Sequence, residues 1–161
     1  MLFRSEALAI RKQLVAEFPN RPIFRRALAM SHSNLGWVFY KTGRPQEAEA
    51  AYRDSLALYK RVVADFPNRP EFLLELAGSH HNLNHVLRDA GRPVEAEAAR
   101  AEALAIYKQL VADFPSRPEF RQAFADAEPQ EARAATGERA GDNGEKEIIS
   151  GALGASDFPK K

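Results

Sequence analysis

The chain contains no cysteine, which excludes a disulfide framework and any thiolate metal site. No apolar run approaches the ~18 residues that a membrane-spanning helix requires. A charge arrives at Arg4, too early for a secretory signal. Basic and acidic side chains nearly cancel, with a net charge of +1, so the strongly basic face of nucleic-acid-binding proteins is not expected. These absences favour a cytoplasmic protein that binds neither nucleic acid nor membrane.

Repetition is what the sequence has instead. A seven-residue motif reads FPNRPIF at 18–24, FPNRPEF at 66–72 and FPSRPEF at 114–120, so its copies start 48 residues apart. We call these three motifs the joints. A Gly-Arg-Pro turn at 43–45 recurs at 91–93, and 28 of the 48 positions in 18–65 are identical in 66–113. A fixed period of this size predicts a stack of repeated supersecondary units.

The apolar residues between these motifs recur every three or four positions, which predicts helices. The expected ranges are 2–17, 22–42, 45–65, 70–90 and 93–113, with a further start at 117. Proline fits the first turn of a helix, Asn20 is expected to cap the helix that follows it, and Gly43 supplies a left-handed C-terminal residue. Short connections make neighbouring helices antiparallel, so an all-α fold of helix hairpins is predicted.

The predicted organisation is a repeat array over 1–127 and a mostly disordered tail over 128–161. The array comprises a half-unit at 2–17, unit one at 18–65, unit two at 66–113 and a half-unit at 114–127. Ile10 near one end and Phe120 and Phe124 near the other are interior-type residues without a neighbouring unit. Both ends are therefore expected to expose apolar side chains and to support weak head-to-tail self-association.

The hairpins resemble the tetratricopeptide repeat. The matching positions are Asn34, Leu35, Gly36, Phe39, Gly43, Ala48, Tyr52 and Leu56. Unit two departs from the pattern with Asn84 in place of the glycine and Arg100 in place of the aromatic residue, and His32 and His80 stand where the family has tryptophan. The usual unit has about 34 residues; the longer period is similar to kinesin light chains and to bacterial arrays attached to kinases. The resemblance implies a right-handed α-solenoid that acts as a protein- or peptide-binding scaffold.

In that family the first helix of each hairpin lines a concave groove. By position, the groove residues are Ser33, Asn34, Trp37, Tyr40 and Lys41 in unit one, and His81, Asn82, His85, Arg88 and Asp89 in unit two. The two units differ most at these positions, which fits a surface that reads something different at each step, although neutral drift is the alternative. Asn34 and Asn82 could bind an extended peptide backbone or a neighbouring helix. Trp37 could anchor a ligand or pack against the next unit.

Other chemistries are weaker candidates. His81, His85 and Asp89 have the spacing of metal ligands on one helix face, so a metal or small-ligand sensor is one alternative and an end-to-end stacking fragment is another. The arginines of the joints and turns favour loop stabilisation over phosphate binding; they are Arg21, Arg44, Arg69, Arg92 and Arg117. The serines lie inside predicted helices, without a nucleophile turn or a glycine-rich phosphate loop. We therefore expect no enzyme activity, no cofactor and no metal.

Overall fold

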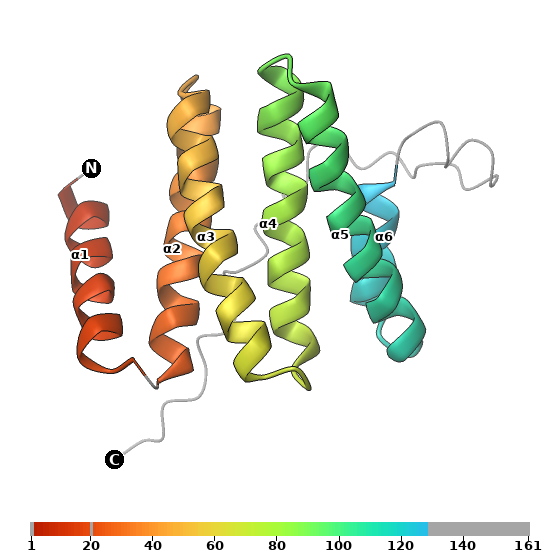
Figure 1. Cartoon of the computed structure of the whole chain (residues 1–161), viewed down its shortest axis with the longest axis horizontal. Coiled ribbons are helices and arrows are strands. Elements are labelled where there is room, and N and C mark those ends of the chain that lie inside the picture. The colour runs from red at the N-terminus through yellow and green to blue at the C-terminus, as the bar shows by residue number, and fades with distance from the viewer. Residues whose placement is uncertain (1, 20, 129–161) are drawn as a thin grey trace. The chain divides into compact units, whose positions relative to one another are not determined.

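A computed structural model describes residues 2–19 and 21–128. Its six helices follow the predicted order (Figure 1). They are α1 (Leu2–Glu17), α2 (Pro22–Lys41), α3 (Pro45–Asp65), α4 (Pro70–Asp89), α5 (Pro93–Asp113) and α6 (Pro118–Ala127). The contacts divide the chain into Met1–Ala127 and Glu128–Lys161. The expected disorder of the tail falls on 129–161, which lies outside the described residues. The predicted all-α fold of sequential hairpins is confirmed.

The connections between helices follow the punctuation in the sequence. Gly43 and Gly91 have φ values of 72° and 71°, a backbone region that residues with a Cβ rarely adopt. After each glycine the chain reaches back to the helix it has left, since the Arg44 N–H donates to the Phe39 carbonyl and the Arg92 N–H to the Leu87 carbonyl. These bonds satisfy carbonyls that the helix end leaves free.

The capping expected of Asn20 falls on a residue outside the described ranges. The N-cap residue of α2 is Arg21, which has extended backbone and makes no side-chain capping bond. Arg69 has the same place before α4. The helix starts are instead ordered by backbone bonds, in which the Arg21 and Arg69 N–H groups donate to the carbonyls of Phe18 and Phe66. Each helix then begins with proline, which has no N–H that would need a cap.

Each joint also pairs its two phenylalanines. The ring centroids lie 5.7 Å apart for Phe18 and Phe24, and 6.2 Å apart for Phe66 and Phe72. The third pair, Phe114 and Phe120, lies 5.8 Å apart. Tilted and edge-on rings at such distances attract each other beyond their burial. The first and last residues of the motif therefore contact each other in each joint, which gives both phenylalanines a structural role in all three copies.

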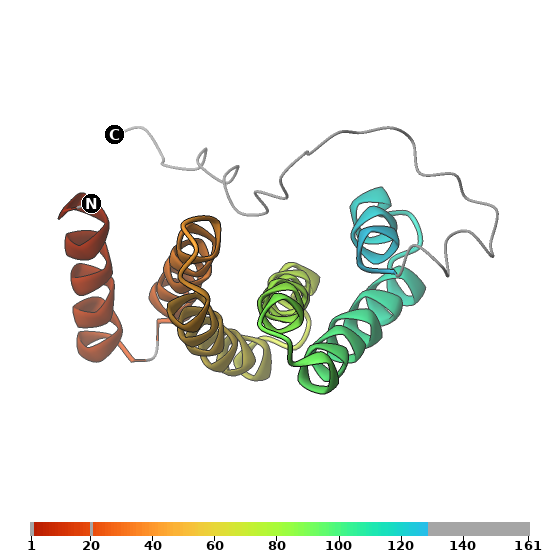
Figure 2. The ribbon, with the colours of Figure 1, turned by 90° about the horizontal axis from the view of Figure 1, so that it is seen from above.

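The helices of the array contact mainly their sequence neighbours, with a smaller contact between α2 and α4. Seen from above, α2, α4 and α6 lie on one side of Met1–Ala127 and α3 and α5 on the other (Figure 2). We call the first set the inner helices and the second set the outer helices. Tyr52, Leu83, Val86 and Leu87 are buried in the core between the two complete hairpins. The predicted groove residues belong to two of the inner helices, α2 and α4.

The two departures of unit two from the family pattern correspond to two residues that lie against each other in unit one. In unit one a Cβ on Gly36 would lie 2.9 Å from two ring atoms of Tyr52, which is only 2% exposed. The Tyr52 ring thus fills the space that a side chain at position 36 would occupy. Unit two carries Asn84 and Arg100 at these two positions, both changed together. The larger residue on the inner helix is accompanied by a flexible side chain on the outer helix.

The two ends of the array differ from each other, contrary to expectation. Ile10 is 57% exposed on α1 and Phe18 is 46% exposed, as the open N-terminal half-unit predicted. At the other end, the prediction that Phe120 is exposed is wrong: it is fully buried against the core of α5 and α6, with Phe124 half-buried beside it. The basis for complementary apolar ends therefore holds at one end only. Among the described residues, no helix is long and apolar enough to cross a membrane.

Candidate functional site

The predicted groove residues of unit one lie on the second half of α2. Asn34, Trp37 and Lys41 are exposed, whereas Ser33 and Tyr40 are half-buried. Trp37 is 38% exposed, and the Lys41 ammonium lies 5.9 Å from the centroid of its ring. That distance is within the range of a cation–π contact. An indole that is partly open to solvent has apolar surface left for a ligand.

The predicted residues of unit two lie on α4 in the equivalent positions. Arg88 and Asp89 are exposed, and His81, Asn82 and His85 are half-buried. The Tyr40 hydroxyl of α2 donates to the Asp89 carboxylate at 2.5 Å, and this bond raises the pKa of Tyr40. The structure thus brings the two sets side by side, and it ties one member of each set to the other. Tyr40 and Asp89 hold the inner helices together instead of standing free for a ligand.

Asn34 and Asn82 have no hydrogen bond to any described residue. The alternative that they bind a neighbouring helix therefore finds no support within residues 2–19 and 21–128. A side-chain amide carries two donors and an acceptor, and both amides occupy the same position in their units. The array thus offers two equivalent and unengaged amide groups, one on α2 and one on α4.

The comparison with known proteins bears on this part of the chain. Residues 28–68 match a family model described as a tetratricopeptide repeat. These residues are a tetratricopeptide repeat. The matched stretch covers most of α2, the Gly-Arg-Pro turn and the whole of α3. Neither the curated proteins nor the solved structures yield a match. Tetratricopeptide repeats suggest protein-binding scaffolds in general.

The histidines beyond this tetratricopeptide repeat form a close pair on α4. The Nε2 atoms of His81 and His85 are 3.0 Å apart, so one ring donates and the other accepts. Burial lowers the pKa of His85, with the neighbouring Arg88 adding to the effect. The third member of the predicted metal ladder, Asp89, is engaged by Tyr40. Among the described residues, no group of three or more potential ligands is placed to hold a metal ion.

Two further histidines were not expected to matter. His32, in the tetratricopeptide repeat, and its equivalent His80 are each only 7% exposed, at the position where the family has tryptophan. Burial lowers the pKa of both rings. A lysine on the helix before that of each histidine lowers the pKa further, while an acidic residue on the helix after it raises the pKa. The charged neighbours are Lys12 and Asp54 for His32, and Lys60 and Glu102 for His80. The histidine, the lysine and the acidic residue each recur after 48 residues, and this spacing could have revealed the arrangement.

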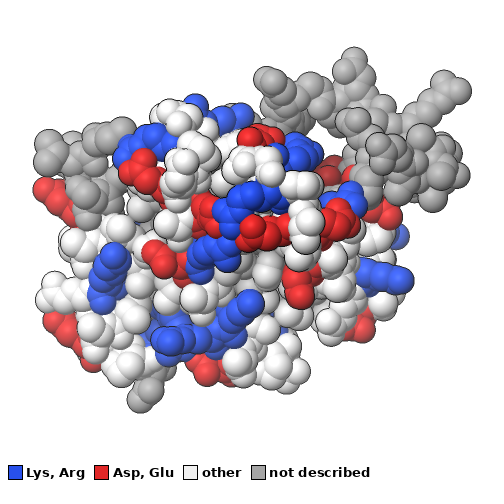
Figure 3. Space-filling view, turned by 45° about the horizontal axis from the view of Figure 1, so that its top comes forward, with Lys and Arg blue, Asp and Glu red and all other residues white. Residues whose placement is uncertain are grey.

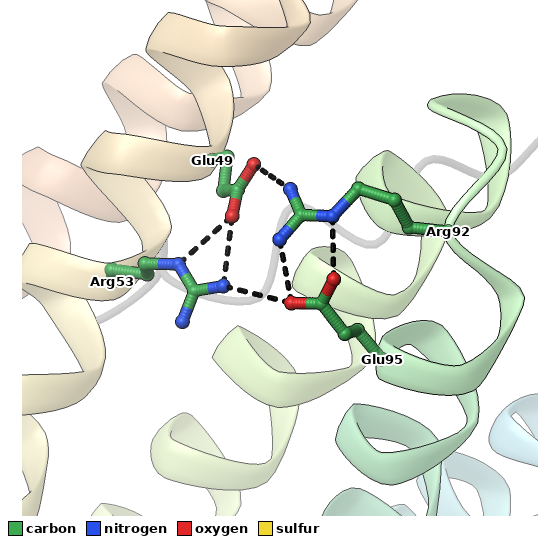
Figure 4. Close-up of polar contacts among 4 residues, drawn as sticks. All are labelled: Glu49, Arg53, Arg92 and Glu95. Atoms are coloured by element: carbon green, nitrogen blue, oxygen red, sulfur yellow. Dashed lines mark hydrogen bonds and ion pairs between the residues drawn. The ribbon is translucent and has the colours of Figure 1, made fainter.

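Most joint and turn arginines are engaged in ion pairs, which fits the predicted loop stabilisation. In the second turn, Arg92 donates to Glu95 at 2.7 Å and to Glu49 of α3 at 2.6 Å. Arg53 binds Glu49 at 2.8 Å and lies 3.7 Å from Glu95 (Figure 4). This quartet links the tetratricopeptide repeat to the start of α5. On the face seen in Figure 3, basic and acidic side chains are interleaved, so no large patch of one sign forms there.

Three serines, Ser31, Ser55 and Ser79, have structural partners. Ser55 donates to the Ala29 carbonyl at 2.9 Å and lies 3.3 Å from the Ser79 hydroxyl, both in the buried core between hairpins. Ser31 donates to the Ala27 carbonyl and accepts from Arg11. A hydroxyl activated for catalysis needs a base within hydrogen-bond reach, and these hydroxyls are bonded to backbone carbonyls. A tetratricopeptide repeat is usually non-catalytic.

Proposed function

We propose that the inner side of the array binds an extended or helical peptide from a partner protein. The contact would be made by the predicted groove residues for which no bond to another helix is found among the described residues, namely Asn34, Trp37 and Lys41 of α2 and Asn82 and Arg88 of α4. The two amides would bind the peptide backbone, and the Trp37 ring would cover an apolar side chain. The partner's identity is left open by this chemistry.

The observation that carries the proposal is the pair of unengaged amides at equivalent positions. The buried serine that recurs, Ser31 in unit one and Ser79 in unit two, donates to a backbone carbonyl of its own helix in each unit. Asn34 and Asn82 repeat without an internal partner among the described residues. A polar side chain that recurs without a structural bond is best explained by a bond to something outside the chain. Trp37, between exposed and buried, provides an adjacent apolar surface.

The experiment uses a property of Trp37 itself. It is the chain's only tryptophan, so intrinsic tryptophan fluorescence reports on the proposed groove alone. Peptides selected from a random displayed library would be titrated into the protein, and groove binding is expected to shift the Trp37 emission to shorter wavelength. The Asn34→Ala/Asn82→Ala double variant should lose binding while its circular dichroism stays unchanged.

The matched control is Val94→Ala. Val94 is 82% exposed in the first turn of the outer helix α5, so its loss should leave both folding and peptide binding intact. Peptides that bind the correctly folded double variant as tightly as the wild type would contradict the groove proposal. Binding without a change in Trp37 emission would place the contact elsewhere on the molecule, with the same consequence.

A further inference from the structure

The second joint borders an open pocket that none of the predicted groove residues lines. Its volume is about 380 Å³, and it lies between the start of α4 and the end of α5. The lining residues that matter here are Pro67, Asn68, Leu73, Gln109, Asp113 and Phe114. Four of them are exposed, including the polar residues Asn68, Gln109 and Asp113, so the polar wall of the pocket is open to solvent.

The equivalent position in unit one is occupied by a side chain of the protein itself. Forty-eight residues earlier, the equivalent of Leu73 is Arg25. The Arg25 guanidinium forms an ion pair with Asp65 and donates to the Pro19 carbonyl at 2.5 Å. Its side chain is only 16% exposed. In unit one, therefore, an arginine side chain from α2 occupies this position and bridges a carboxylate at the end of α3 to a carbonyl of the joint.

Unit two keeps the acceptors and loses the cation. Asp113 and Pro67 are the equivalents of Asp65 and Pro19, but Leu73 has no group that can donate to them. A second basic residue is lost as well, because Gln109 stands where unit one has Arg61. Asp113 forms no ion pair with the residues that the structure describes. Relative to unit one, the residues around this pocket include two fewer basic side chains.

The chemistry of the walls selects a guanidinium. The carboxylate lies at the C-terminus of α5, where the helix dipole adds negative potential and favours a cation. A planar guanidinium can donate to two acceptors at once and pack its faces on proline and aromatic rings, and Phe114 lines the pocket. We propose that this pocket binds the guanidinium of an arginine side chain from a partner protein, in the place that Arg25 fills in unit one. This site is separate from the groove and does not rest on the function proposed for it.

The first test is an NMR titration of the full chain with N-acetyl-L-arginine N-methylamide. The backbone signals of Leu73 and Asp113 are expected to shift saturably, and the neutral isostere, the matching citrulline derivative, should bind at least tenfold more weakly. Asp113→Asn should also weaken binding at least tenfold. Equal binding of the arginine and citrulline derivatives would overturn the proposal, as would binding only of free arginine with its own carboxylate, since a partner's side chain lacks that group.

The repeat supplies two sharper variants. Leu73→Arg should fill the pocket from within, as Arg25 does, and abolish the titration while the helical circular dichroism is retained. Arg25→Leu combined with Arg61→Gln should open the equivalent pocket in unit one and raise the stoichiometry from one to two. Undiminished binding to a folded Leu73→Arg protein would refute the assignment. The Asn34→Ala/Asn82→Ala variant should bind the arginine derivative normally, which keeps the outcome independent of the groove.

Discussion

Replacing Gly36 by alanine tests the packing of the tetratricopeptide repeat at its tightest point. The new methyl group would lie 2.9 Å from Cε1 and Cζ of Tyr52, a ring that is 2% exposed and has no room to retreat. Inserting an atom into a packed core costs about 1–3 kcal/mol. Alanine also favours a helix over glycine by about 1 kcal/mol, which partly offsets that cost. The net effect expected for Gly36→Ala is a loss of stability of up to about 2 kcal/mol.

Gly78 is the matched control, because it is also a helical glycine on an inner helix. A Cβ there would lie 3.8 Å from the Tyr107 hydroxyl, an ordinary van der Waals contact. Gly78→Ala should therefore stabilise the protein by about 0.5–1 kcal/mol. The helix-propensity gain is common to both variants, so the difference between them isolates the overpacking cost of about 1–3 kcal/mol.

Urea unfolding followed by the helical circular dichroism signal measures both changes. A double-mutant cycle with Tyr52→Leu should remove most of the penalty of Gly36→Ala, because the clashing ring is gone. Equal shifts of stability in the same direction for both glycine variants would refute the overpacking of Gly36 against Tyr52. The same conclusion would follow if the Gly36→Ala penalty stayed unchanged in the protein that already carries Tyr52→Leu.

Three further outcomes are expected. Burial lowers the pKa of His32 and His80 in the folded state, so their neutral forms stabilise the fold fully above about pH 6.5. Below that pH the free energy of unfolding should fall by up to about 1.4 kcal/mol per pH unit for each histidine. Urea melts at several pH values should show a weaker pH dependence of stability in His80→Gln. Phe120→Ala should cost about 3–5 kcal/mol, as measured by thermal unfolding, and a neutral result would mean that α6 does not cover the last core. Leu83→Ala should cost about 2–5 kcal/mol, whereas His85→Ala should stay within about 1 kcal/mol; the reverse order would mean that the facing of α4 is misassigned.

Much of the fold was predictable because its punctuation is local. Proline restricts the backbone and glycine permits the left-handed region, each through its own covalent structure, so the starts at Pro22 and Pro45 and the left-handed turn at Gly43 could be placed without knowing any neighbour. The helices followed from the spacing of apolar residues, whereas the inner place of the first helix of each unit was expected only from the family resemblance. At Arg21 and Arg69, just before two proline-led helices, backbone bonds order the helix start, and side-chain capping propensity alone does not predict them.

Features that depend on three-dimensional neighbours were harder to predict. The burial of Phe120 arises from contact with α5, and nothing in the residues after 127 indicates it. The contact between Tyr40 and Asp89 joins helices that are not consecutive, so neither residue's position announces the other. The sequence shows that unit two changes both Gly36 and Tyr52, but only the structure shows that these two positions lie against each other. The groove assignment itself stays a prediction.

The predominance of contacts between consecutive helices has a consequence for how the chain acquires its structure. Within the described helices, most contacts join segments that a short connection already holds together, so the entropy of closing long loops does little to slow folding. Proteins built from contacts this local fold on microsecond to millisecond timescales. The same locality means that opening at one end need not disturb the other. Amide hydrogen exchange should therefore be fastest in α1, which contacts mainly α2, and slowest around Tyr52 and Leu83, where two complete hairpins meet.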